Sequence, residues 1–171
     1  MLRATPHLLE NAVSFVAEQD SLNASVLGPD AAPGTPEFDL FIKEAQREMT
    51  TKAGQKCTAI RRIIAPAAHV DAVIDALSAR LSKTRIGDPR EKDTRMGPLV
   101  STSQRDDVLE KVALLRTQAE RVHGNPDDFT VHGADAAKGA FLPPMLFHCA
   151  DPDSATHVHD TEAFGPVSTV M

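Results

Sequence analysis

The sequence predicts an α/β fold in which an open sheet is flanked by helices, and it predicts that the domain is truncated. Its 171 residues, 42% of them hydrophobic, are enough for one domain with its own core. Segments with apolar residues at helical spacing alternate with short runs rich in Val and Ile, an order typical of α/β domains. The apolar run 167–171 ends without a terminating residue, which indicates a domain cut within a strand.

The N-terminal part is predicted to hold a short buried strand and then a helix. The apolar run 12–17 stops at charged residues and predicts the strand. Pro and Gly residues over 29–36 predict a connector. Thr35 is suited to cap a helix because its hydroxyl can accept an unpaired backbone N–H, and Pro36 suits the first helical position. The apolar stripe of this helix consists of Phe38, Phe41, Ile42, Ala45 and Met49.

The segment after this helix is predicted to be a turn that leads into a strand. Gly54 is the expected helix terminator, which places Cys57 on the turn. A strand is predicted over 59–65 and ends at Pro66. A second helix follows over 70–81, where apolar residues recur at the same helical spacing.

The C-terminal half is predicted to contain one more helix and three more strands. Residues 101–104 form a capping-box pattern that starts the helix. Residues 119–144 are rich in loop formers around one short strand near 121–123. Further strands are expected over 145–150 and 165–171.

Composition excludes several classes of function. The net charge of −6 and the absence of a basic block argue against binding to a nucleic-acid backbone, and the lack of Trp and Tyr argues against base stacking. No run of 18 apolar residues predicts a membrane span, and the N-terminus does not resemble a secretory signal. Because only two cysteines are present, we expect neither a disulfide framework nor a cysteine-based zinc site, and we expect a cytoplasmic location.

Cys57 is the most informative single residue. It follows Lys56 and precedes Arg61 and Arg62, and positive neighbours favour the reactive thiolate. The alternative is that Cys57 is a small buried residue, as most isolated cysteines are. Cys149 lies in an apolar run, where core packing is expected.

Carboxylates and histidines supply further candidates. Glu18 follows the predicted N-terminal strand, where partial burial would raise the pKa of its carboxyl toward that of a general base. Glu162 precedes a Gly-Pro turn that can present an acid to a ligand hydroxyl. Solvated loop carboxylates are the alternative in both cases. His157 and His159 would share one face of a strand and bind a metal, but no third ligand stands out, so no metal site is predicted.

Taken in order, four motifs resemble those of the aldehyde dehydrogenase superfamily over nearly the whole chain. Residues 54–57 resemble its Gly-Gln-x-Cys nucleophile motif, and residues 162–167 resemble its Glu-x-Phe-Gly-Pro-Val motif. Between them, in the order of the superfamily, lie Met-Gly-Pro-Leu at 96–99 and Gly-Ala-Phe-Leu-Pro-Pro at 139–144.

The resemblance implies a role for each matching residue. Cys57 would attack an aldehyde to form a thiohemiacetal, with its backbone N–H in the oxyanion hole. Hydride loss to NADP or NAD would leave a thioester, which water activated by Glu18 would hydrolyse. Glu162 and Phe164 would contribute to cofactor binding, and Glu162 would hold the ribose hydroxyls next to the nicotinamide.

A closer resemblance narrows the substrate class. Residues 18–23 replace the Glu-Leu-Gly-Gly-Lys setting that most of the superfamily places around its base. Together with residues 54–62, they are similar to the aldehyde dehydrogenase half of the bifunctional proteins of phenylacetate degradation, whose other half is an oxepin-CoA hydrolase. This likeness implies oxidation of a CoA-linked semialdehyde.

The resemblance also implies that residues 1–171 are a partial catalytic domain. The nucleotide-binding domain and the C-terminal part would lie outside this chain, so the cofactor site would be incomplete and the chain alone inactive. The whole protein would be a homo-oligomer. Two alternatives stay open, namely a CoA-acylating aldehyde dehydrogenase, and a non-catalytic domain in which Cys57 senses redox state or the surface serves assembly.

Overall fold

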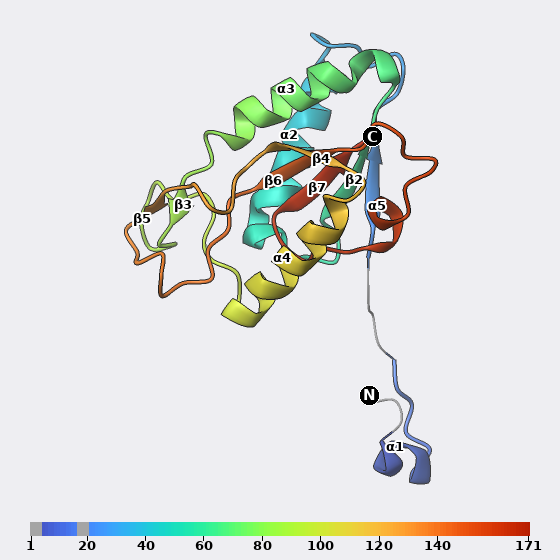
Figure 1. Ribbon diagram of the computed structural model, residues 1–171, viewed down its shortest axis with the longest axis vertical. Helices are drawn as coiled ribbons and strands as arrows, with labels where there is room; N and C mark the ends of the chain where they lie inside the picture. The colour runs from blue at the N-terminus through green and yellow to red at the C-terminus, as the bar shows by residue number, and fades with distance from the viewer. Residues whose placement is uncertain (1–4, 17–20) are drawn as a thin grey trace.

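A five-stranded sheet forms the centre of the molecule in the computed structural model, which describes residues 5–16 and 21–171 (Figure 1). In spatial order, the strands are β1 Asn23–Val26, β2 Ile60–Ile64, β7 Val167–Val170, β6 Met145–His148 and β4 Glu120–His123. The first four are parallel neighbours, and β4 pairs with β6 in the antiparallel direction. This architecture confirms the predicted α/β fold with an open sheet.

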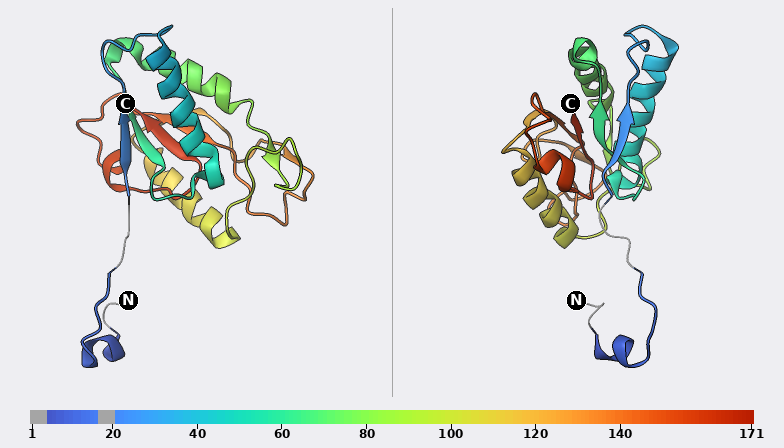
Figure 2. Two further views of the ribbon diagram at one scale, coloured as in Figure 1. Left: turned by 180° about the vertical axis from the view of Figure 1, so that it is seen from behind. Right: turned by 90° about the vertical axis from the view of Figure 1, so that its right-hand side faces the viewer.

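Helices cover both faces of the sheet (Figure 2). The helices are α1 Pro6–Glu10, α2 Pro36–Thr50, α3 Val70–Leu81, α4 Thr102–Leu115 and α5 His157–Asp160, with short 3-10 turns at Thr51–Gly54 and Ala67–His69. Helices α2 and α3 pack on one face, and α4 packs on the other. No helix in the described ranges is both long enough and apolar enough to cross a bilayer.

Alternating side chains of the inner strands supply both halves of the core. On β6, Leu146 belongs to the apolar cluster beneath α2 and α3, whereas Met145 and Phe147 belong to the cluster beneath α4. The alternation follows from the two-residue repeat of a strand. Every residue of β7 is buried, as expected of a parallel strand covered on both faces.

The β3–β5 lobe (residues 86–98 and 125–140) lies at one end of the sheet, at the left of Figure 1. Strand β3 Ile86–Gly87 pairs in parallel with β5 Val131–His132. A glycine is required at position 87, because a Cβ there would lie 2.1 Å from the backbone oxygen of His132. The sequence did not predict this strand pair, since two residues are too few for a periodic signal.

Most predicted elements are confirmed. Thr35 caps α2 by accepting a hydrogen bond from the N–H of Phe38, and Ser101 caps α4 by accepting one from the N–H of Gln104. The helix predicted over 70–81 is α3. The strands predicted near 59–65, 121–123, 145–150 and 165–171 are β2, β4, β6 and β7.

The strand predicted over 12–17 is wrong for the part that the structure describes. Residues 12–16 are neither helix nor strand, and the side chains of Val13 and Val16 are 48% and 89% exposed. Figures 1 and 2 show α1 and this segment apart from the sheet, so the run is not covered by the sheet or by the helices packed on it. The edge strand is instead β1, whose alternating burial the sequence reasoning did not detect.

Candidate functional site

Cys57 lies on an exposed turn between α2 and β2, as predicted. Helix α2 ends at Thr50 and not at Gly54, and a 3-10 turn follows. Within it, Lys52, Ala53 and Gly54 have positive φ angles of 54°, 51° and 69°. Two consecutive non-glycine residues in the left-handed region are costly, so the surrounding structure must hold this turn in place.

The backbone carbonyl of Cys57 is held by two side chains from the segment that enters β1. The hydroxyl of Ser21 and the side-chain amide of Asn23 each donate to this oxygen over 2.5 Å. Asn23 also donates to the carbonyl of Ala59 over 3.3 Å. The N–H of Cys57 has no acceptor among the described residues. The turn is therefore fixed through its carbonyl, while one N–H beside the exposed thiol stays available.

The side chains that flank Cys57 in the sequence are bound elsewhere. Gln55 accepts a hydrogen bond from the N–H of Val100 over 3.0 Å. Lys56 forms an ion pair with Glu48 over 2.6 Å, and about four fifths of each side chain is buried. The local cations that the sequence associates with the thiol thus have other partners in the fold.

Glu162 approaches the Cys57 turn through Ser21. One carboxylate oxygen accepts the backbone N–H of Ser21 over 2.9 Å, and the other lies 3.4 Å from its hydroxyl. The side chain of Glu162 is 9% exposed. Ser21 therefore contacts both the carbonyl of Cys57 and the carboxylate of Glu162, which joins two motifs that are far apart in the sequence.

A buried arginine, Arg61, also connects the two motifs at 54–57 and 162–167. Arg61 is 5% exposed and donates to the carbonyls of Gly54 and Gly165, each over 2.7 Å. Its Nε lies 3.6 Å from Glu162, close enough for an ion pair but not for a hydrogen bond. Burial lowers the pKa of Arg61 from its ordinary value, while the charge of Glu162 opposes this. An arginine remains protonated under these conditions, so the charge is paired inside the fold.

Phe164 contributes to this cluster through its ring and its backbone. The Arg61 guanidinium lies 5.6 Å from the centre of the Phe164 ring, within the range of a cation–π contact. The carbonyl of Phe164 accepts a hydrogen bond from the side chain of Gln104 over 3.2 Å. We call Arg61, Gly54, Glu162, Phe164 and Gly165 the Arg61 network.

Gly54 is required by close packing within the Arg61 network. A Cβ at this position would lie 2.1 Å from the backbone oxygen of Gly165, and the φ of +69° disfavours a side chain as well. The two motif loops are therefore in backbone contact, which explains why a glycine occupies position 54 of the predicted nucleophile motif.

The structure brings together three of the four predicted site residues. Cys57, Glu162 and Phe164 are linked through Ser21 and Arg61, whereas Glu18 lies outside the described residues. Sequence reasoning assigned no role to Ser21 and used Arg61 only as a neighbouring charge. The available signal for Ser21 was its position in the unusual 18–23 segment.

The remaining candidates have other roles. His157 and His159 lie in the short helix α5 and not on a strand, and the described residues contain no group of three or more potential metal-binding side chains. His159 contacts the carbonyl of Pro152 over 2.9 Å. Cys149 is buried in the core as predicted, and burial raises the pKa of its thiol.

Sequence comparison finds one family. The pattern of the aldehyde dehydrogenase family matches residues 9–171. A protein of Aromatoleum evansii named 3,4-dehydroadipyl-CoA semialdehyde dehydrogenase is 49% identical over 170 residues, which are 99% of this chain and 33% of that protein. Geranial dehydrogenase of Castellaniella defragrans is 30% identical over 135 residues, which are 79% of this chain and 27% of that protein.

Solved structures with the same fold agree with this result. Betaine aldehyde dehydrogenase of Staphylococcus aureus, in complex with NAD+, is 28% identical with a TM-score of 0.77, and the match covers 99% of this chain and 33% of that one. A mutant aldehyde dehydrogenase of Bacillus cereus is 29% identical with a TM-score of 0.69, covering 88% and 28%. The chain thus spans about a third of the length of the relatives it matches.

Proposed function

The chain belongs to the aldehyde dehydrogenase family, and on this premise we propose that it is a partial catalytic domain of an enzyme that oxidises an aldehyde to a carboxylate with NAD or NADP. The observation that carries the proposal is the exposed Cys57 on a turn bound through Ser21 to Glu162. The rest of the enzyme, including the nucleotide-binding domain, would lie outside residues 1–171, in line with relatives three times as long.

In the proposed reaction, the Cys57 thiolate attacks the aldehyde carbon, and a C–S bond forms as the carbonyl oxygen becomes an oxyanion. The N–H of Cys57, which has no acceptor among residues 5–16 and 21–171, is suited to stabilise that charge, because a fixed donor acts without reorganisation. A nicotinamide cofactor would supply the acceptor for the hydride that leaves the former aldehyde carbon. The thioester left on Cys57 is then hydrolysed, which releases the carboxylate and regenerates the thiol. Glu18 is the proposed base that activates the water.

Glu162 fits a role in holding the cofactor ribose. An ionised carboxylate has about four acceptor positions, and here it engages Ser21 and Arg61. Acceptor capacity therefore remains for a hydroxyl donor, and Arg61 and Ser21 fix the direction of the carboxylate. Phe164 would support this position through its contact with Arg61.

For the substrate, we propose a CoA-linked semialdehyde. The support is the 49% identity to the Aromatoleum protein, whose name specifies such a substrate. The intermediate of phenylacetate degradation that the sequence resemblance implies belongs to the same chemical class and stays a prediction. The choice between NAD and NADP and assembly of the whole protein into a homo-oligomer stay predictions as well.

The decisive test uses the longer protein that contains this chain, purified and mixed with a CoA-linked semialdehyde and NAD or NADP. We expect a burst of reduced nicotinamide and an acyl adduct on the peptide that contains Cys57, both lost in Cys57→Ala. Cys149→Ala is the matched control and should keep both signals. A burst in Cys57→Ala would contradict the proposal. The 171-residue chain alone should show negligible turnover.

The CoA-acylating alternative differs in the fate of the thioester. Hydrolysis depends on a base, so Glu18→Gln should abolish release of the free acid and leave the acyl adduct trapped on Cys57. Release of an acyl-CoA from the wild-type protein, unaffected by Glu18→Gln, would instead favour transfer to CoA.

A second candidate is a non-catalytic thiol, and one observation favours it. Lys56 and Arg61 are bound to Glu48 and Glu162, so the nearest cations in the sequence do not act freely on the thiol. Labelling of Cys57 by iodoacetamide across a pH series separates the two functions. A midpoint at about pH 8.5, the value of an ordinary thiol, together with absence of the acyl adduct, would favour the non-catalytic role.

A further inference from the structure

Positively charged side chains line a cavity of about 550 Å³ that does not include Cys57. The cavity lies between the ends of α2 and α3 and the β3–β5 lobe. Its lining residues are Gln46, Arg47, Thr50, Arg80, Lys83, Thr84 and Arg95. Four of the seven are cations and none is an acid, in a chain whose net charge is −6. We call this set of residues the basic cavity.

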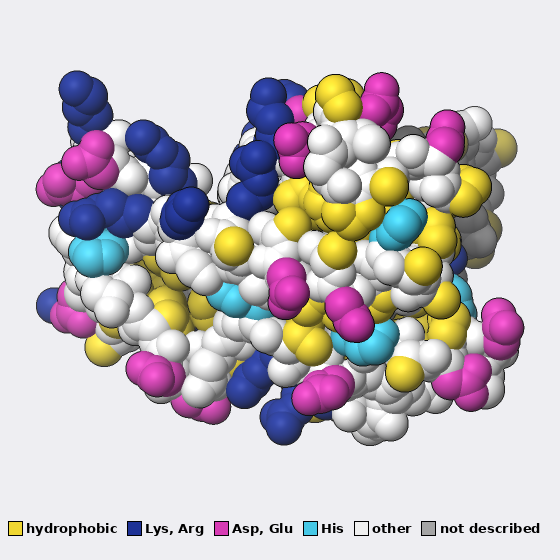
Figure 3. Space-filling model, turned by 90° about the horizontal axis from the view of Figure 1, so that it is seen from above, with side chains coloured by type: hydrophobic (Ala, Val, Ile, Leu, Met, Phe, Trp, Pro, Cys, Tyr) yellow, Lys and Arg dark blue, Asp and Glu magenta, His cyan; other side chains and the backbone are white. Residues whose placement is uncertain are grey.

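Lys and Arg side chains gather on the face of the molecule that carries this recess. Figure 3, seen from above, shows Lys and Arg side chains on both sides of the recess between the β3–β5 lobe, at the left, and the rest of the molecule. Two of the lining cations come from helices, one from the linker after α3, and one from the lobe. The cluster is therefore assembled by the tertiary fold and not by a basic run in the sequence.

Most of this charge has no acidic partner in the part of the chain that the structure describes. Arg80 and Lys83 have no side-chain hydrogen bond or ion pair with the described residues. Arg95 donates through one nitrogen to the carbonyls of Lys92 and Thr94 and has no acidic partner among the described residues. Arg47 pairs with Glu44 over 3.0 Å, but both side chains are exposed and such pairs are weak.

Helix dipoles explain only part of this arrangement. Arg47 and Arg80 lie in the last turns of α2 and α3, where a cation is favourable. Lys83 and Arg95 lie outside helices and gain nothing comparable. Four like charges around one recess repel each other, and an anion bound between them would relieve that repulsion.

The donor set fits phosphate groups. Guanidinium groups bind phosphate oxygens in a bidentate manner, and a lysine adds a compact positive charge. A volume of about 550 Å³ is within the range of small-molecule sites and exceeds what a single inorganic ion needs. A nucleotide that carries several phosphates matches both the charge and the size.

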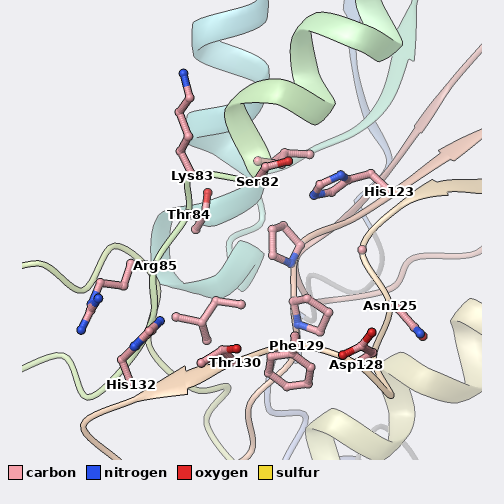
Figure 4. A pocket seen from close by; sticks show the side chains of 15 residues that line it. Ser82, Lys83, Thr84, Arg85, His123, Asn125, Asp128, Phe129, Thr130 and His132 are labelled. Carbon is pink, nitrogen blue, oxygen red and sulfur yellow. The ribbon is translucent and has the colours of Figure 1, made fainter.

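A neighbouring cavity of about 520 Å³ shows a different chemistry. It is lined by His123, His132, Asp128 and Phe129 among others, and it shares Lys83 and Thr84 with the basic cavity. In Figure 4, the side chain of Lys83 extends away from His123 and Phe129. The charge of Lys83 is thus directed away from that cavity, whose lining includes a carboxylate that would repel phosphate.

We propose that the basic cavity binds the phosphate groups of a CoA-linked substrate. This inference rests on the proposed function, because CoA is the part of that substrate that carries phosphates. The cavity lies at the end of α2 that leads to Cys57: Thr50 lines it, and the seven residues from there to Cys57 span at most about 25 Å even when extended. The long pantetheine arm of CoA would then run between the phosphates and the thiol.

The test measures binding to the 171-residue chain itself, by calorimetry at low and physiological salt. The probes are CoA, adenosine 3′,5′-bisphosphate, inorganic phosphate and phosphate-free pantetheine. We expect CoA and the bisphosphate to bind at least tenfold more tightly than inorganic phosphate, and pantetheine not to bind. The double variant Arg80→Ala/Lys83→Ala should lose at least tenfold in affinity for both nucleotides, and the loss should shrink at high salt.

The matched control is Arg116→Ala/Lys138→Ala, which removes the same charge from exposed positions outside the cavity and should bind like wild type. Unchanged nucleotide binding in the cavity variant, an equal loss in the control, or equal affinity for phosphate and bisphosphate would each overturn the proposal. Cys57→Ala should bind CoA normally, since the cavity does not include the thiol. Failure of the proposed function would be seen in turnover and in the acyl adduct, whereas failure of the binding proposal would be seen in calorimetry. The two failures are therefore distinguishable.

Discussion

The Arg61 network and the basic cavity differ in how their positive charge is paired. In the Arg61 network, a buried guanidinium meets a carboxylate, two carbonyls and an aromatic ring. In the basic cavity, Arg80 and Lys83 have no partner among the described residues and face open space. A charge whose partners are all internal holds structure together, whereas charges grouped without partners indicate a ligand from outside.

The largest loss of stability is expected when the buried charge of the Arg61 network is removed. Arg61→Ala leaves Glu162 unpaired and the carbonyls of Gly54 and Gly165 without donors, so we expect the free energy of unfolding to fall by about 3–5 kcal/mol. Urea denaturation measures this loss. Arg61→Lys retains the charge but lacks the two guanidinium nitrogens that bind both carbonyls, so its loss of stability should be smaller than that of Arg61→Ala. An equally small loss in both variants would mean that Arg61 does not hold the two loops together.

The next largest effect is expected where the two motif loops touch. Gly54→Ala places a Cβ 2.1 Å from the oxygen of Gly165 and keeps a positive φ, so we expect a loss of about 1–3 kcal/mol. The Cys57 turn should move as well, and the rate at which iodoacetamide labels Cys57 should therefore change. Gly34→Ala is the matched control, since its φ is also positive but a Cβ there meets nothing within 4 Å. Equal losses in the two variants would rule out the loop contact as the cause.

A smaller effect is expected at the residue that joins Cys57 to Glu162. Ser21→Ala removes the hydroxyl donor to the Cys57 carbonyl but keeps the backbone N–H that binds Glu162, so stability should fall by about 1 kcal/mol. In the longer enzyme, kcat should fall more than KM changes, because the turn that carries the thiol loses one of its two anchors. A change confined to KM would contradict this role.

The smallest effect on stability is expected in the basic cavity. Arg80→Ala removes a charge that has no partner among the described residues, so stability without ligand should change by less than about 0.5 kcal/mol. Arg80→Ala relieves repulsion among the four cations but also loses a favourable interaction with the C-terminal end of α3, so the two effects oppose each other. Both effects should weaken at high salt, where the change in stability should be smaller still. A clear loss of stability at both low and high salt would mean that Arg80, like Arg61, stabilises the fold.

Local signals in the sequence were sufficient for the elements with a strong pattern. The apolar stripes of α2 and α3 and the caps Thr35 and Ser101 act over one to three turns, so neighbouring residues determine them. The family resemblance rests on ordered motifs in the same way. The run 12–16 shows the limit, because a short apolar segment becomes a buried strand only if another surface covers it.

By itself, the sequence determined the α/β class, most helices and strands, and the family, because these depend on periodicity, caps and motif order along the chain. Only the tertiary structure decided that Ser21 contacts both Cys57 and Glu162, that Arg61 is a buried link and not a free cation, and that the basic cavity exists. The physical reason is that such contacts join residues from different elements. Their distances depend on how the strands are ordered and the loops packed, which no local pattern specifies.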